Sequence, residues 1–80
     1  MMITIRAFGI AKEICGGSTF QMELSDKATA GDLKQTLSEQ YPRLGNLASF
    51  LLAVNEEFAQ EDTILHASDE IAIIPPVSGG

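Results

Sequence analysis

The residues with the clearest chemical potential are the last six of the chain, Pro75-Pro76-Val77-Ser78-Gly79-Gly80. The two prolines stop a preceding aliphatic run and stiffen the base of this segment, which lowers the entropy cost of docking. Gly79 and Gly80 carry no Cβ, so they occupy little space and can adopt φ values closed to other residues, and the Ser78 hydroxyl can form a hydrogen bond. The pattern predicts that Gly80 is the working end of the protein. The alternative is a frayed terminus with flexible glycines.

Other reactive side chains make a weaker case. Four carboxylates lie close together in the sequence, at Glu56, Glu57, Glu61 and Asp62. They can handle protons or a hard cation, but neighbouring carboxylates in a polar turn are more often a solvated rim. His66 has no nucleophile placed near it by the sequence. Cys15 lacks a partner at ligand spacing, which favours a small buried apolar residue. We therefore expect this chain to bind no metal and no cofactor.

The charge distribution argues against nucleic-acid binding. The net charge is −6 and the five basic residues are spread along the chain, whereas phosphate binding needs clustered lysine and arginine. The single cysteine cannot form an internal disulfide, which fits a reducing compartment. There is no signal-peptide pattern and no apolar stretch long enough to span a bilayer, so we expect no membrane partner and a cytoplasmic location.

Two strands are predicted near the N-terminus, over residues 2–8 and 19–24, because apolar residues alternate there. The core-facing residues of the first strand are Ile3, Ile5 and Ala7. The opposite face of that strand carries Thr4, Arg6 and Phe8. Between the strands, residues 11–15 are expected to form one helical turn, and Gly16-Gly17-Ser18 is typical of a turn that makes the strands antiparallel.

The main helix is predicted to begin after Thr29, which acts as N-cap with Asp32 three residues later. An apolar stripe follows at helical spacing, formed by Ala30, Leu33, Leu37 and Tyr41. Pro42 ends the helix, and residues 43–49 are expected to be irregular.

Three further strands are expected after the helix. Residues 50–54 are almost continuously apolar, which is typical of a strand buried on both faces. A turn at residues 55–57 leads to a short return strand at 58–60, and residues 71–74 form the last strand.

This order of elements predicts an α+β domain over residues 1–80, with residues 75–80 as a protruding tail. One mixed sheet of about five strands packs on one main helix, which is the β-grasp arrangement found in ubiquitin. The first and last strands are expected to lie side by side and parallel in the middle of the sheet.

The chain resembles the ubiquitin-like sulfur carriers, and among them the small subunits of molybdopterin synthases, over essentially its full length. The likeness rests on the Pro-Pro-Val-Ser-Gly-Gly ending, on Leu52-Ala53-Val54-Asn55 before a turn, and on Phe8 followed by Ala11-Lys12-Glu13-Ile14.

The resemblance implies a mechanism in which the chain carries sulfur. A ubiquitin-activating-type enzyme uses ATP to adenylate the Gly80 carboxylate, and a sulfur donor protein displaces AMP to leave a thiocarboxylate. The tail then enters the large synthase subunit within a heterotetramer and supplies sulfur for the dithiolene of molybdopterin, made from cyclic pyranopterin monophosphate. The pterin site would belong to that partner, so this chain would be a non-catalytic donor subunit.

Strand parity adds a predicted docking surface. Phe8 and Ile74 fall on the face away from the core, on strands predicted to be neighbours, and Phe58 can join them. Exposed apolar residues that cluster near a functional tail indicate an interface. The alternative is a small secondary core under a loop.

Three rival interpretations remain open at this point. A sulfur carrier for thiamine thiazole synthesis would use the same Gly-Gly chemistry with another acceptor. A ubiquitin-like protein modifier would join Gly80 to a lysine through an isopeptide bond. A binding module with an inert tail would not need Gly80.

Overall fold

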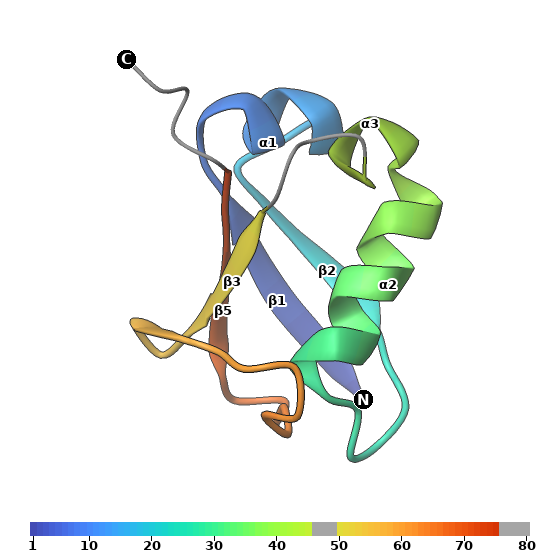
Figure 1. Cartoon of the computed structure of the whole chain (residues 1–80), viewed down its shortest axis with the longest axis vertical. Helices are drawn as coiled ribbons and strands as arrows, with labels where there is room; N and C mark the ends of the chain where they lie inside the picture. The colour runs from blue at the N-terminus through green and yellow to red at the C-terminus, as the bar shows by residue number, and fades with distance from the viewer. Residues whose placement is uncertain (46–49, 76–80) are drawn as a thin grey trace.

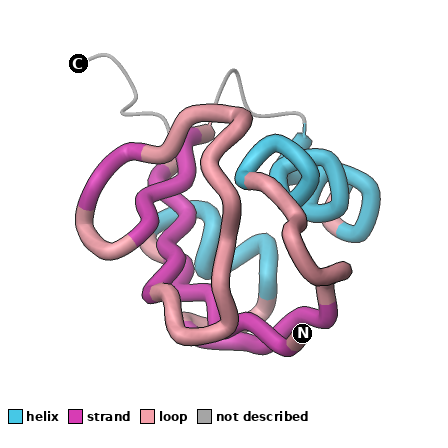
Figure 2. The backbone as a smooth tube through the Cα atoms, turned by 90° about the horizontal axis from the view of Figure 1, so that it is seen from below, coloured by secondary structure: helices cyan, strands magenta, loops and turns pink. Residues whose placement is uncertain are grey.

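The computed structural model describes residues 1–45 and 50–75, which build one mixed five-stranded sheet packed on a main helix (Figures 1 and 2). The strands are β1 (Met2–Ala7), β2 (Thr19–Glu23), β3 (Leu51–Val54), β4 (Glu57–Phe58) and β5 (Glu70–Ile74). The helices are α1 (Gly9–Cys15), α2 (Ala30–Gln40) and α3 (Pro42–Gly45). The strand order is β2-β1-β5-β3-β4, with β1 and β5 parallel and every other pair antiparallel. The predicted β-grasp architecture is therefore confirmed.

One face of the sheet packs against α2 and forms the core. Alternation in β1 places Ile3, Ile5 and Ala7 on this face, at 1% exposure or less, as predicted. Leu33 and Leu37 of α2 are fully buried in the same apolar cluster. Figure 2 shows the strands as one layer, with α2 lying to one side of them.

The start of α2 follows the predicted capping pattern. The Thr29 hydroxyl accepts a hydrogen bond from the Asp32 backbone N–H at 3.2 Å, and the Asp32 carboxylate accepts one from the Thr29 N–H at 2.9 Å. This reciprocal pair satisfies two helix N–H groups that have no partner within the helix. Asp32 also stands at the positive end of the helix dipole.

The short helices differ from the sequence prediction. α1 is a full seven-residue helix instead of one turn, because it begins already at Gly9 (φ +57°) and ends on Gly16 in a left-handed conformation (φ +82°). Cys15 at its end is partly buried and packs against the core, so the expectation of a small buried apolar residue is confirmed in part. Residues 42–45, predicted mainly as irregular chain, form α3 because the fully buried Leu44 anchors them to the core.

The expectation that residues 50–54 form a strand buried on both faces is also wrong. Leu52 is 2% exposed but its neighbour Leu51 is 47% exposed, because the helices cover only one face of the sheet. The following turn has just two residues with positive φ, Asn55 (+54°) and Glu56 (+72°). The return strand β4 therefore begins at Glu57, one residue earlier than predicted.

The arrangement of the ends matters for function. β5 finishes beside α1, at the opposite end of the molecule from the N-terminus (Figure 1).

Within residues 1–45 and 50–75, none of the helices has both the length and the apolar character needed to cross a bilayer.

Candidate functional site

Most of the predicted reactive tail lies outside the described residues, which end at Pro75. The predicted positions concerned are Pro76, Val77, Ser78, Gly79 and Gly80. Pro75 is half-buried and directly follows β5. It lies next to the start of α1, where a Cβ placed on Gly9 would be 3.6 Å from the Pro75 Cγ. The base of the tail is therefore in contact range of the β1–α1 connection.

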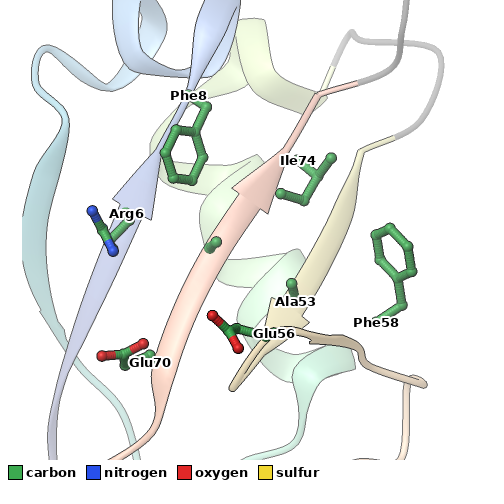
Figure 3. Close-up of a pocket in the computed structure, with 8 residues that line it drawn as sticks. Arg6, Phe8, Ala53, Glu56, Phe58, Glu70 and Ile74 are labelled. Atoms are coloured by element: carbon green, nitrogen blue, oxygen red, sulfur yellow. The ribbon is translucent and has the colours of Figure 1, made fainter.

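The structure brings the three predicted docking residues onto one face. Phe8, Ile74 and Phe58 come from the ends of β1, β5 and β4, and all line a hollow on the side of the sheet away from α2 (Figure 3). Phe8 is 45% exposed and Phe58 is 68% exposed, while Ile74 is half-buried. No loop of the described chain covers them as a secondary core, because both phenylalanine rings remain accessible.

Two alanines create the hollow between the larger side chains. Ala53 of β3 and Ala72 of β5 are direct partners in the antiparallel ladder, and both face the open side. Their methyl groups leave a depression of about 350 Å³ bordered by Phe8, Phe58 and Ile74. A concave apolar surface of this kind offers a seat for apolar side chains of another protein.

Charged groups border the same hollow at the end away from the tail. Arg6 places its guanidinium carbon 5.8 Å from the Phe8 ring centroid, within the range of a cation–π contact. Glu56 and Glu70 supply carboxylates to this border, with Glu70 on the same side of β5 as Arg6 and Glu56 on the other side (Figure 3). An apolar centre with a charged border is the usual anatomy of a protein interface.

A network around Asn55 holds the border in place. The Asn55 side chain accepts a hydrogen bond from the Glu70 N–H at 2.9 Å and donates one to Asp69 at 3.0 Å. Its own N–H donates to the Glu70 carbonyl at 2.8 Å. Asn55 thereby joins the β3–β4 turn to the start of β5, which explains why an asparagine occupies this turn position.

Asp69 is the titratable group with the most defined surroundings. Burial pushes the pKa of this carboxyl upward, but hydrogen bonds from the Asn55 side chain and the His66 N–H, together with the His66 ring, hold the pKa below its ordinary value. The His66 ring is 70% exposed, and its Nδ1 lies 3.6 Å from the Asp69 carboxylate. Both carboxylate oxygens of Asp69 accept hydrogen bonds, one from the Asn55 side chain and one from the His66 N–H, so we interpret the pair as a structural clamp on a turn.

The remaining reactive residues are dispersed over the surface. The residues Glu56, Glu57, Glu61 and Asp62 are all exposed. Among the residues that the structure describes, no group of three or more histidine, cysteine, aspartate or glutamate side chains is arranged to hold a metal ion. Burial raises the pKa of the Cys15 thiol, which disfavours the reactive thiolate.

Sequence reasoning missed one part of the open face. Leu51 is 47% exposed and pairs directly with Ile74 across β3 and β5, so it extends the apolar surface towards the end of the sheet where the tail begins. Strand parity could have found it, because Leu51 and Ala53 alternate with the buried Leu52. The continuous apolar run over residues 50–54 masked this alternation, because it is typical of a strand buried on both faces.

Known proteins share both the sequence pattern and the fold. The model of the ThiS family matches residues 5–80. The molybdopterin synthase sulfur carrier subunit of Dictyostelium discoideum is 40% identical over 80 residues, which cover 95% of this chain and 93% of that relative.

Two solved structures are similar over both full chains. SAMP1 of Haloferax volcanii, a small archaeal modifier protein, matches with a TM-score of 0.83 and 27% identity, covering 100% of each chain. A chain in the complex of subunits 1 and 2 of the molybdopterin-converting factor from Helicobacter pylori matches with a TM-score of 0.68 and 27% identity, again over 100% of each chain.

Proposed function

We propose a function for this chain from the premise that it belongs to the ThiS family, alongside the molybdopterin synthase sulfur carrier subunits. The chain is the small subunit of a molybdopterin synthase and supplies sulfur for the dithiolene of molybdopterin. The family resemblance predicted from the sequence is confirmed. The observation that carries the proposal is the open apolar hollow lined by Phe8, Phe58 and Ile74, on a sheet whose last strand leads into the tail.

The chemistry of transfer depends on activation of the Gly80 carboxylate. A carboxylate is a poor acyl donor, because its negative charge is delocalised and its leaving group would be oxide. Adenylation by an ATP-using activating enzyme provides AMP as the leaving group. Sulfur delivered by the donor at the oxidation level of sulfide then attacks the acyl carbon, and the bond to AMP breaks to leave a thiocarboxylate. The sulfur of this thiocarboxylate is the nucleophile that the synthase delivers to cyclic pyranopterin monophosphate.

The surface of the described residues suits binding to a protein, so we assign docking to this chain and the pterin chemistry to its partner. The hollow presents apolar contacts and charges at its border, which suit binding of a protein, and the pterin pocket belongs to the large subunit in this proposal. In Helicobacter pylori, the similar chain is known from a complex of subunits 1 and 2 of the molybdopterin-converting factor. We expect the large subunit and the activating enzyme to use the open face in turn, in the cytoplasm, while the tail from Pro75 to Gly80 enters the partner's active site.

Reconstitution tests this function directly. The chain is incubated with ATP, an activating enzyme and a sulfur donor, purified, and mixed with the large subunit and cyclic pyranopterin monophosphate. Molybdopterin formation by the sulfurated chain, with none from a chain lacking Gly80, is the expected result. Equal activity without Gly80 would contradict the proposal.

A second candidate function is favoured by the similarity to SAMP1 of Haloferax volcanii. A protein modifier would use the same activated Gly80 but join it to a lysine amine. The two functions differ in their products, since a modifier gives adducts of high mass and a sulfur carrier gives a thiocarboxylate of almost unchanged mass. Intact-mass analysis after activation distinguishes them.

A further inference from the structure

We propose that Glu56 is a specificity-determining residue of the docking surface, where its carboxylate pairs with a lysine or arginine of the large synthase subunit. The inference rests on the proposed function and deepens it, because it names the chemistry that the partner must present at one border of the hollow.

Glu56 lies in the two-residue turn of a β-hairpin. Val54 pairs with Glu57 across β3 and β4, so only Asn55 and Glu56 connect the two strands. Both residues have a positive φ, +54° for Asn55 and +72° for Glu56, which is the pattern of a type I′ turn. Asparagine is common at the first position of this turn, whereas the second position favours glycine. Glu56 therefore occupies a position where its side chain costs the fold some stability.

The surroundings of the turn hold Glu56 in this unfavourable conformation. The Asn55 side chain accepts a hydrogen bond from the Glu70 N–H at 2.9 Å, and the Asn55 N–H donates to the Glu70 carbonyl at 2.8 Å. The turn is thereby tied to the start of β5, and Figure 3 shows the Glu56 carboxylate at the border of the hollow. Strained residues that their surroundings hold in place cluster at functional sites.

The Glu56 carboxylate is free to pair with another molecule. Within residues 1–45 and 50–75, Glu56 takes part in none of the ion pairs and none of the side-chain hydrogen bonds. Arg6, the basic side chain that lines the hollow, lies against the Phe8 ring instead. Glu70 adds a second carboxylate to the same border, and the whole chain has a net charge of −6. A basic side chain of the partner would complement this border.

A charge at the border gives the hollow a selectivity that its apolar floor lacks. The methyl groups of Ala53 and Ala72 accept any apolar side chain of suitable size. An ion pair at one border favours a partner with a basic residue beside its apolar contact, and disfavours a partner with an acidic residue there. Because Glu56 is exposed, such a pair acts mainly on the association rate and on its dependence on salt.

The test uses two substitutions of Glu56 and one matched control. Glu56→Gln removes the charge and keeps the size of the side chain. Glu56→Gly removes the charge and also the unfavourable conformation. Glu57→Gln is the control, because it removes the same charge one residue later. Glu57 does not line the hollow and instead borders another groove with Val54.

The first readout is the association rate with the large subunit, measured by stopped flow at low and at high salt. We expect both Glu56 variants to associate about five-fold more slowly than wild type at low salt, and Glu57→Gln to stay within about two-fold. These differences should vanish at about 0.5 M salt, because salt screens exposed charges. The second readout is thermal unfolding, in which the Tm of Glu56→Gly should equal that of wild type or exceed it by up to about 4 °C.

Each outcome decides the inference. Equal association rates of Glu56→Gln and wild type at low salt would overturn it, and so would equal slowing by Glu56→Gln and Glu57→Gln, because the net charge alone would then explain the effect. A Tm of Glu56→Gly clearly below that of wild type would also overturn it, since stability of the turn would then explain the glutamate.

Failure of the proposed function gives a different result. A wild-type chain that does not associate with the large subunit would remove the proposed function, and the inference with it. A wild-type chain that associates and yields molybdopterin, while Glu56→Gln associates equally fast, would remove the inference alone.

Discussion

Ala53 and Ala72 face each other across β3 and β5, and their small side chains form the floor of the hollow between Phe8 and Phe58. Larger residues here would fill the depression from within the sheet. The pair therefore links a local feature of strand pairing to the shape of the proposed docking surface.

Ala72→Leu should weaken docking without harming the fold. The leucine side chain would occupy the hollow, while the core face of β5 stays unchanged, so stability should move by only about 0.5 kcal/mol. Binding to the large subunit, measured by calorimetric titration, should weaken by at least about ten-fold, which corresponds to 1.4 kcal/mol. Gln35→Leu on the exposed side of α2 adds the same group elsewhere and should bind normally. Tight binding by Ala72→Leu would show that the hollow is not the docking surface.

Phe8→Asp should weaken docking more strongly. Exposed aromatic anchors commonly contribute about 2 kcal/mol or more to an interface, so we expect at least a roughly 30-fold rise in Kd. Ile64→Asp is the matched control, because Ile64 is 51% exposed and lies outside the hollow. Equal affinity of folded Phe8→Asp and wild type, in the same titration, would remove Phe8 from the interface.

The sequence could predict the elements that face the core better than those that face a partner. Alternation fixed the orientation of β1 correctly, because burial against α2 demands apolar residues at every second position. The open face follows no such demand, and Leu51 was overlooked because its exposure depends on the absence of a second helical layer. Likewise, α3 depends on burial of Leu44 through long-range packing, which local pattern does not contain.

In the candidate site, too, the local pattern predicted some features, and others depended on long-range pairing. Phe8, Phe58 and Ile74 could be placed on one surface from parity and strand order alone. Their separation by Ala53 and Ala72 depends on the register of the ladder. Register is set by pairing between distant strands, so single-strand patterns do not reveal it.

Leu37→Ala should destabilise the fold strongly, since Leu37 is fully buried between α2 and the sheet. Removal of a large buried aliphatic group leaves a cavity and costs about 2–5 kcal/mol. Urea denaturation monitored by circular dichroism measures this change. Gln35→Ala, on the exposed side of the same helix, is the control and should change stability by less than about 0.5 kcal/mol. A similarly small effect for Leu37→Ala would contradict the described core.

Acid should remove the contribution of Asp69 to stability. The pKa of Asp69 is lower in the folded protein than its ordinary value. The charged carboxylate therefore stabilises the fold at pH values above that ordinary pKa. This stabilisation is lost as pH falls through the lowered pKa. Denaturation between about pH 5 and pH 2 should show a smaller loss of stability for Asp69→Asn than for wild type. Asp62→Asn in the neighbouring exposed loop controls for the change in charge. If stability fell equally with pH in wild type and Asp69→Asn, the hydrogen bonds of Asp69 would not stabilise the fold.

The central claim is that Gly80 carries sulfur, and intact-mass spectrometry measures this most directly. After incubation with ATP, an activating enzyme and a sulfur donor, the chain should gain the mass difference between sulfur and oxygen, and a variant lacking Gly80 should not. A chain that binds the large subunit yet keeps its original carboxylate under every activating enzyme tested, or that appears only in high-mass lysine adducts, would contradict the account.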